Sequence, residues 1–248
     1  MTTQPLIALK NIKKVFDDDS AKHLVAVENI NLDIYPGEFF VFLGPSGSGK
    51  STLLRIMSRL EHSFDGELVF APGVTPNDFS FVFQHFALLP WLSVRENVGL
   101  GLETRKLPDR ERHAIIEKEL RTFGLEKFRE SRPRELSGGM RQRVGIARAL
   151  ATEPKVIFMD EPFSEIDSFT AEELRKELLA IWQEQHPTIV MVTHMIEEAI
   201  ELADRIAVMT QRPGRIEKIL TNTLARPREK RSAPFYAVED ELQRLIAP

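Results

Sequence analysis

Cysteine is absent from this chain of 248 residues, which excludes disulfide bonds, thiol nucleophiles and cysteine-ligated zinc and leaves the compartment open. No apolar run approaches the roughly eighteen residues that a membrane helix needs. The start of the chain has no basic segment followed by a long apolar one, so we expect no secretory signal. A net charge of −4 disfavours a general nucleic-acid binder. We therefore expect a cytoplasmic protein, or one that its partners hold at a membrane.

Short runs of continuous apolar residues are present, and they predict strands buried on both faces, as in a parallel sheet covered by helices. Four of them carry polar or glycine residues just past their ends. Ligands of open α/β sheets bind beyond the carboxyl ends of the strands, so we predict an α/β domain with its chemistry at one edge. The runs are EFFVFLG (38–44), FSFVFQ (79–84), KVIFMDE (155–161), TIVMVTH (188–194) and RIAVM (205–209).

The remaining segments complete a single domain, residues 1–248. Two partly alternating segments, 6–16 and 26–35, predict an antiparallel pair around the polar DDDSAK. Residues 87–150 lack a strand pattern and predict a helical subdomain, inserted between the strand ending at Gln84 and the one starting at Lys155. The expected helices cover 50–60, 140–150, 170–185 and 194–203 and begin at Ser93 and Pro108, with capping boxes at Ser93–Glu96 and Thr170–Glu173.

The tail, about 224–248, contains the basic RPREKR. We interpret it as a solvated linker, in preference to a patch for anionic lipid.

One glycine-rich loop fits the phosphate-binding pattern G-x-x-x-x-G-K-[ST] and lies between an apolar strand and a helix. Its backbone N–H groups can surround phosphate oxygens, and the helix that follows adds its positive end. Lys50 would reach the β- and γ-phosphates, and the Ser51 hydroxyl would bind Mg²⁺. The loop consists of Gly44, Pro45, Ser46, Gly47, Ser48, Gly49, Lys50, Ser51 and Thr52.

Side chains at other strand ends can complete a nucleotide site. Asp160 stands where such proteins place the carboxylate that holds Mg²⁺, and Glu161 could deprotonate an attacking water. The Gln84 amide could bind Mg²⁺ or orient water, or it could serve only as a loop hydrogen bond. His194 could touch the γ-phosphate, although a histidine in this position is often structural. Phe16 could stack on adenine, or it could pack in the core.

A second glycine pair, in ELSGGMRQR (135–143), also begins a helix. Ser137, Gly138 and Gly139 together make an anion-binding helix start that has no phosphate of its own within reach. The predicted helical insertion separates it from the first loop. We therefore expect it to serve the nucleotide of another subunit, in a two-fold, head-to-tail pair.

LSGGMRQRVGIARAL resembles the signature segment of the ATP-binding subunits of ABC transporters, and the other motifs follow in that family's order over about residues 6–220. The resemblance implies ATP and Mg²⁺ as cofactors, Phe16 as the adenine-stacking ring, Gln84 as the link to the membrane partner, Glu161 as catalytic base and His194 as γ-phosphate sensor. It further implies that SEID (164–167) crosses between subunits, with Asp167 at the site. Glu165 is a departure, because a small apolar residue is usual there, and it bears on the dimer contact and turnover.

The resemblance also implies the partners: a second ATPase subunit, either identical or closely related, transmembrane permease subunits and, indirectly, a solute-binding protein. LLPWLSVRENV (88–98) and RPGRI (212–216) are similar to importers of nitrate, taurine and alkanesulfonates, although Trp91 could merely pack among helices and RPG could merely form a turn. The implied location is the cytoplasmic face of the inner membrane.

Two other functions are compatible with the motifs. One is a soluble ABC-type ATPase that acts on nucleic acid or ribosomes, and the other is a regulatory module that binds nucleotide without hydrolysing it. The acidic net charge argues against the first, and the presence of Lys50, Asp160, Glu161 and His194 argues against the second.

Overall fold

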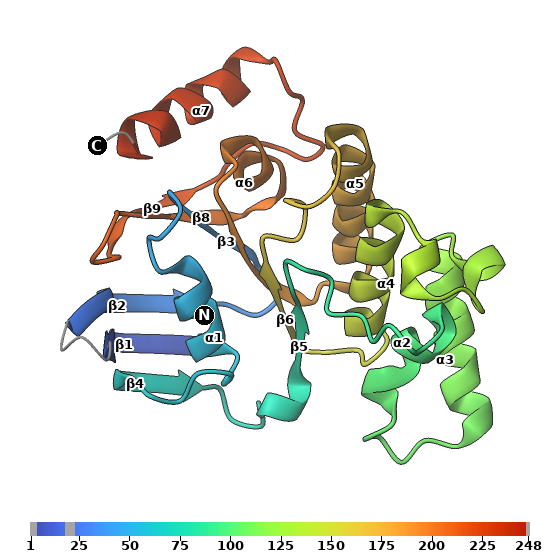
Figure 1. The fold of residues 1–248 in the computed structure, drawn as a ribbon. Coiled ribbons are helices and arrows are strands. Elements are labelled where there is room, and N and C mark those ends of the chain that lie inside the picture. Colours follow the sequence, from blue (N-terminus) through green and yellow to red (C-terminus); the bar gives the residue numbers. More distant parts are fainter. Residues whose placement is uncertain (1–3, 18–22, 247–248) are drawn as a thin grey trace. The chain divides into compact units, whose positions relative to one another are not determined.

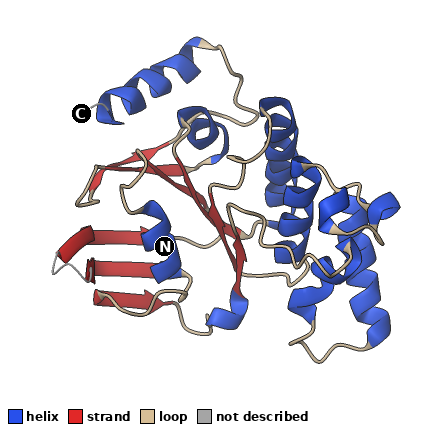
Figure 2. Ribbon diagram, in the orientation of Figure 1, coloured by secondary structure: helices blue, strands red, loops and turns tan. Residues whose placement is uncertain are grey.

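The computed structural model describes residues 4–17 and 23–246 (Figures 1 and 2). The chain divides into two compact units. The first unit consists of Met1–Pro76 and Gln185–Pro248, and the second of Asn77–Glu184. Most of the DDDSAK connection lies outside the described residues. In the part of the chain that is described, no helix is long and apolar enough to cross a membrane.

An antiparallel sheet opens the first unit. It contains β1 (Ile7–Asp17), β2 (His23–Ile34) and β4 (Asp65–Phe70) in the order β2-β1-β4. The antiparallel pairing of β1 with β2 confirms the prediction made from their partial alternation. The sequence did not predict β4, because the strand buries little of its surface and therefore has a weak apolar pattern.

Buried strands form the other sheet segment of this unit, in which β3 (Phe39–Leu43) lies between β7 (Thr188–Thr193) and β8 (Arg205–Met209), all parallel. Every residue of β3 and β7 is buried, which is why their sequences are continuously apolar. A further strand, β9 (Ile216–Thr221), pairs with β8 in the antiparallel direction.

Two helices of this unit differ in length from the prediction. α1 (Lys50–Met57) is shorter than expected, because Arg59 takes a left-handed conformation with φ of 62°. α6 (Ile196–Leu202) begins two residues after His194, since Met195 before it is extended. His194 is therefore in the connection between β7 and α6.

The basic tail is not the solvated linker that we predicted. Arg228 is only 7% exposed, and its guanidinium donates to the carbonyls of Ile200 (2.7 Å) and Ala203 (2.7 Å). Arg226 donates to the Leu202 carbonyl. The last carbonyls of a helix lack hydrogen-bond donors within the helix. At the end of α6 the two arginines provide these donors, and their positive charge suits the helix C-terminus. Beyond them, α7 (Ala233–Ile246), which the sequence did not predict, packs on α6 (Figure 1).

Replacing Arg228 with Met should destabilise the protein, because the carbonyls of Glu201 and Ala203 at the end of α6 lose their guanidinium donor and Ile200 keeps only Asn222. Burial lowers the pKa of this guanidinium to about 10, so it is still charged at neutral pH. We expect the free energy of unfolding to fall by about 2–4 kcal/mol in urea denaturation. The control is the exposed Arg231→Met, which should change it by less than about 0.5 kcal/mol. Equal effects of the two substitutions would contradict the structural role of Arg228.

The second unit combines a parallel strand pair with helices. The pair is β5 (Phe79–Val82) and β6 (Val156–Asp160), and the segment between them contains helices and no strand among the described residues. Between the two strands lie α2 (Val94–Gly99), α3 (Asp109–Thr122) and α4 (Gly138–Leu150), with short 3₁₀ turns at 100–102, 126–128 and 133–135. A further 3₁₀ turn, at 76–78, precedes β5, and α5 (Ser168–Gln185) follows β6.

Helix starts in this unit test the capping predictions. Ser93 and Glu96 form the predicted capping box, with Glu96 Oε2 accepting from Ser93 N–H at 2.6 Å. The predicted box at Thr170 and Glu173 is wrong. Asp167 caps α5 instead, because its Oδ1 accepts from the Thr170 N–H at 3.1 Å. This bond holds the pKa of Asp167 below its ordinary value.

Candidate active site

The glycine-rich loop runs from the end of β3 into α1, as its sequence predicted. Gly49 caps α1 with a φ of 85°, a left-handed conformation that glycine adopts without strain. The Lys50 ammonium lies inside the loop and donates to the carbonyls of Gly44 (2.8 Å) and Pro45 (2.9 Å). Ser51 and Thr52 follow on the first turn of α1. The loop thus has a cation at its centre and a helix N-terminus at its end, the arrangement that binds phosphate.

Strand register places His194 beside the start of this loop. Leu43, the last residue of β3, pairs with Thr193, the last residue of β7, so Gly44 and His194 follow at the same edge. The backbone here is fixed by Thr193, whose hydroxyl donates to Glu198 (2.6 Å) and accepts from the Met195 N–H (3.0 Å). The His194 side chain is exposed.

Phe16 lies near the end of β1, opposite Leu24 of β2. Its ring is 40% exposed, and the Lys14 ammonium lies 4.7 Å from the ring centroid. The alternative in which Phe16 packs in the core is therefore wrong. Val27, three residues beyond Leu24 on β2, lies close to the glycine-rich loop, since a Cβ on Gly49 would be 2.5 Å from its Cγ1.

A second group of predicted residues meets within the second unit. Val82 of β5 pairs with Met159 of β6, so the residues after these strands continue at one edge of the pair. Gln84 lies on the β5 side, and Asp160 and Glu161 lie on the β6 side. Asp160 is only 4% exposed, whereas Glu161 is partly accessible. An amide and a carboxylate, from Gln84 and Asp160, are among the oxygen ligands that suit Mg²⁺, which binds through one or two carboxylates plus phosphate oxygens.

The SEID loop follows Glu161 and is held by it. The Glu161 carbonyl accepts from the N–H (3.2 Å) and hydroxyl (3.0 Å) of Ser164. The unusual Glu165 pairs with His85, at 2.8 Å between Oε1 and Nδ1. His85, next to Gln84, was missed in the sequence, because no local spacing connects two residues eighty positions apart. The pair gives the charged Glu165 a partner within its own chain.

Ser137 and the two glycines after it stand at the start of α4, where Ser137 is exposed, Gly138 is half-buried and Gly139 is buried. The Ser137 hydroxyl accepts from the Met140 N–H (3.3 Å), so it caps the helix, which starts at Gly138 and not at Met140 as predicted. A Cβ on Gly138 would lie 3.4 Å from the Glu165 carbonyl, so the helix start and the SEID loop are neighbours. Phe169, just past that loop, is 84% exposed.

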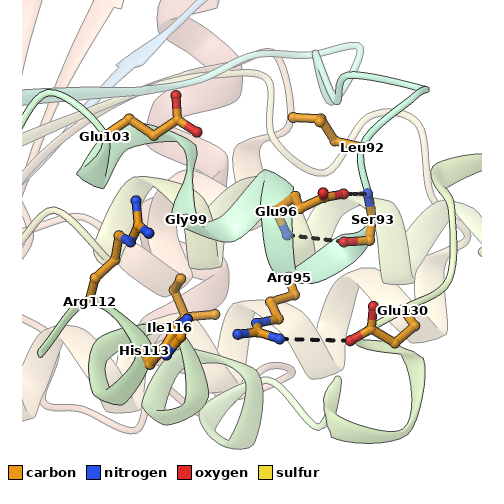
Figure 3. Close-up of a pocket in the computed structure, with 10 residues that line it drawn as sticks. All are labelled: Leu92, Ser93, Arg95, Glu96, Gly99, Glu103, Arg112, His113, Ile116 and Glu130. Atoms are coloured by element: carbon orange, nitrogen blue, oxygen red, sulfur yellow. Dashed lines mark hydrogen bonds and ion pairs between the residues drawn. The ribbon is translucent and has the colours of Figure 1, made fainter. Parts of the chain in front are cut away.

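A hollow of about 320 Å³ lies in the helical part of this unit (Figure 3). Figure 3 shows its charged lining, in which Arg95 pairs with Glu130. Trp91, just before the first lining residue, is 67% exposed, so the alternative in which it packs among helices is wrong. The lining residues are Leu92, Ser93, Arg95, Glu96, Gly99, Glu103, Arg112, His113, Ile116 and Glu130.

With this geometry established, comparison with known proteins identifies the family. Residues 27–164 match the family model described as ABC transporter. The chain belongs to the ABC transporter family. It is an ATPase whose reaction is coupled to transport, as for the ATP-binding subunits of this family, which confirms the implied activity.

Curated members of the ABC transporter family match nearly the whole chain. The nitrate import ATP-binding protein NrtD of a Synechocystis species is 43% identical, over 90% of this chain and 88% of that one. The aliphatic sulfonates import ATP-binding protein SsuB of Bacillus thuringiensis is 40% identical, over 95% of this chain and 94% of that one.

A solved ABC structure supports the fold. It is a dimeric ATP-binding cassette in a post-hydrolysis state, bound to ADP and Pi, and it is 34% identical with a TM-score of 0.77. The alignment covers 88% of this chain and all of that one. The predicted ABC ATPase fold is therefore confirmed.

Proposed function

We propose that this chain is the ATP-hydrolysing subunit of an importer for a small anionic solute such as nitrate, taurine or another sulfonate. The observation that carries the proposal is the identity of 40% or more to import subunits named for nitrate and for aliphatic sulfonates, over most of each chain. The relatives' names support a small anion as the class of solute.

The glycine-rich loop, Gly44–Thr52, here called the P-loop, is the proposed phosphate site, with Lys50 on the β- and γ-phosphates. Its inward ammonium and its position at the start of α1 support this role. Phe16 would stack on adenine, as its exposed ring allows. His194 would contact the γ-phosphate, since it lies at the same sheet edge as Gly44.

Asp160, Ser51 and Gln84 are the residues that would hold Mg²⁺, which would offset the negative charge of the phosphates when bound. Glu161 would accept a proton from the attacking water. Its backbone carbonyl accepts two bonds from Ser164, which fix the main chain directly after the end of β6.

Two subunits would close head to tail, with Ser137–Gly139 of each facing the P-loop nucleotide of the other, and with Asp167 at the same interface. The accessible helix start beside the SEID loop and the exposed Phe169 support an interface on this face. The solved relative with ADP and Pi is itself a dimer. The second subunit is a further copy or a close relative.

Permease subunits at the cytoplasmic face of the inner membrane would dock near Gln84 and the helical region around Trp91, and a solute-binding protein would deliver substrate to them. The exposed indole beside a charged hollow supports docking there, because a large exposed aromatic side chain next to a concave surface is typical of interaction sites.

Affinity purification of the tagged chain from detergent-solubilised membranes of its own host tests this function. We expect mass spectrometry of the eluate to identify a partner with membrane-spanning segments. Trp91→Ser should reduce its recovery severalfold without changing ATP binding, while the control Tyr236→Ser, which removes another exposed aromatic ring, should not. Recovery of nucleic acid in place of a membrane protein would support a soluble ABC-type ATPase and contradict the proposal.

A further inference from the structure

The loop that joins β8 to β9, residues 210–215, has a fixed shape (Figure 1). The Thr210 N–H donates to the Arg215 carbonyl (3.0 Å), and the Arg215 N–H donates to the Thr210 hydroxyl (3.1 Å). That hydroxyl in turn donates to the Pro213 carbonyl (3.2 Å). Thr210 thus closes the loop on itself.

This β8–β9 loop is also anchored to β2. Gly214 donates its N–H to the Ala26 carbonyl (3.0 Å) and accepts from the Glu28 N–H (3.0 Å), so it pairs with Val27 as a strand would. The Arg215 guanidinium pairs with Glu28 at 2.6 Å. The β9 end of the loop is therefore fixed to β2.

The β8–β9 loop contacts the P-loop at two successive carbonyls. Gly214 packs against the Ser48 carbonyl so closely that a Cβ would lie 2.0 Å from its oxygen, and only glycine fits there. Arg212 reaches the preceding carbonyl, with its Nε donating to the Gly47 oxygen at 3.1 Å. The sequence left open that RPG merely forms a turn, and the structure places it directly against the glycine-rich loop.

These contacts lock the peptide between Gly47 and Ser48. A trans peptide points its C=O and N–H to opposite sides. Here the Ser48 N–H donates to the Pro45 carbonyl (3.3 Å), and the Gly47 C=O accepts from Arg212, so both groups are satisfied. The locked peptide comes just before Gly49, where the N–H groups of the helix start begin. A loop that is already ordered loses less conformational freedom when it binds phosphate.

Arg212 also brings charge to the P-loop. Its side chain is exposed, and within the described part of the chain no carboxylate lies within ion-pair distance of it. Its positive charge is therefore not neutralised by a carboxylate, and it adds to the potential of Lys50 and of the α1 N-terminus, which attracts a polyphosphate.

We infer that Arg212 is a positioning residue for ATP binding, which holds the apex of the P-loop through the Gly47 carbonyl and raises the local positive potential. The inference rests on the proposed role of the P-loop as the phosphate site. Because Arg212 acts on the loop and not on the reacting atoms, it should affect nucleotide affinity and KM far more than kcat.

The test compares two variants. Arg212→Met keeps much of the side-chain length but removes the hydrogen-bond donor and the positive charge, and Arg212→Lys restores a donor and the charge in part. The full chain is titrated with a fluorescent ATP analogue, and its ATPase activity is followed against ATP concentration. We expect Arg212→Met to raise Kd and KM about 5- to 30-fold with kcat within about twofold, and Arg212→Lys to return Kd to within about threefold of wild type. Arg231→Met removes an exposed cation outside this loop, and it should leave Kd within about twofold.

Two results would overturn the inference: an Arg212→Met Kd no higher than that of Arg231→Met, or an Arg212→Lys Kd as high as that of Arg212→Met. The Lys50→Met variant distinguishes failure of this inference about Arg212 from failure of the proposal that the P-loop binds phosphate. Normal ATP binding by Lys50→Met would show that the P-loop is not the phosphate site, whereas lost binding together with an unaffected Arg212→Met would refute only the role of Arg212.

Discussion

Glu161→Gln is expected to bind ATP with nearly unchanged affinity and to hydrolyse it at least about 100-fold more slowly. The substitution preserves size and the backbone bonds that the Glu161 carbonyl receives from Ser164, but an amide cannot take a proton from water. Phosphate release under saturating ATP measures the rate, and fluorescent-nucleotide titration measures the affinity.

The control for this experiment is Glu184→Gln, which makes the same chemical change at an exposed position on α5. It should leave both quantities unchanged. Hydrolysis by Glu161→Gln at the wild-type rate would show that another group activates the water and that the assignment of Glu161 as catalytic base is wrong.

Ser137→Arg and Gly138→Asp should leave ATP binding by the monomer nearly intact and block both dimer closure and hydrolysis. The Ser137 side chain is exposed at the start of α4, so an arginine there fills the space that we assign to the partner's nucleotide. An aspartate at Gly138 places negative charge at the same helix start, where it would repel phosphate. We expect hydrolysis to fall at least about 100-fold, since the arrangement of residues around ATP would remain incomplete.

Dimer closure can be measured by analytical ultracentrifugation with ATP in the Glu161→Gln background, where slow hydrolysis preserves the closed state. The matched control is Ser232→Arg, because Ser232 also accepts from a backbone N–H at a helix start, that of Phe235 at 3.3 Å, but precedes α7 and not α4. It should dimerise normally. Loss of ATP binding by the monomeric Ser137→Arg variant would show that the two glycine motifs share one site.

The strands that position the site could be predicted because their burial leaves a local record. β3, β6 and β7 are buried along their whole length, so the sequence of each is mainly a run of apolar residues. The polar or glycine residues that follow each strand can therefore be recognised in the sequence. The same is true of the P-loop, since its function needs fixed residue types at fixed short spacing. β4 could not be found in this way, because it is a largely exposed strand with little apolar pattern.

The sequence by itself determined the ABC ATPase family, the buried strands and the residues at their ends, because these are encoded in contiguous segments. Only the tertiary structure decided the environment of the charged residues. Arg228 bonds carbonyls 25 and 28 positions away, and Glu165 pairs with His85 across the fold. Arg212 bonds Gly47 from 165 positions away. From its neighbours in sequence alone, a basic or acidic residue is predicted to be solvated. Its actual partner lies far away in the sequence and is identified only when the folded chain brings the two together.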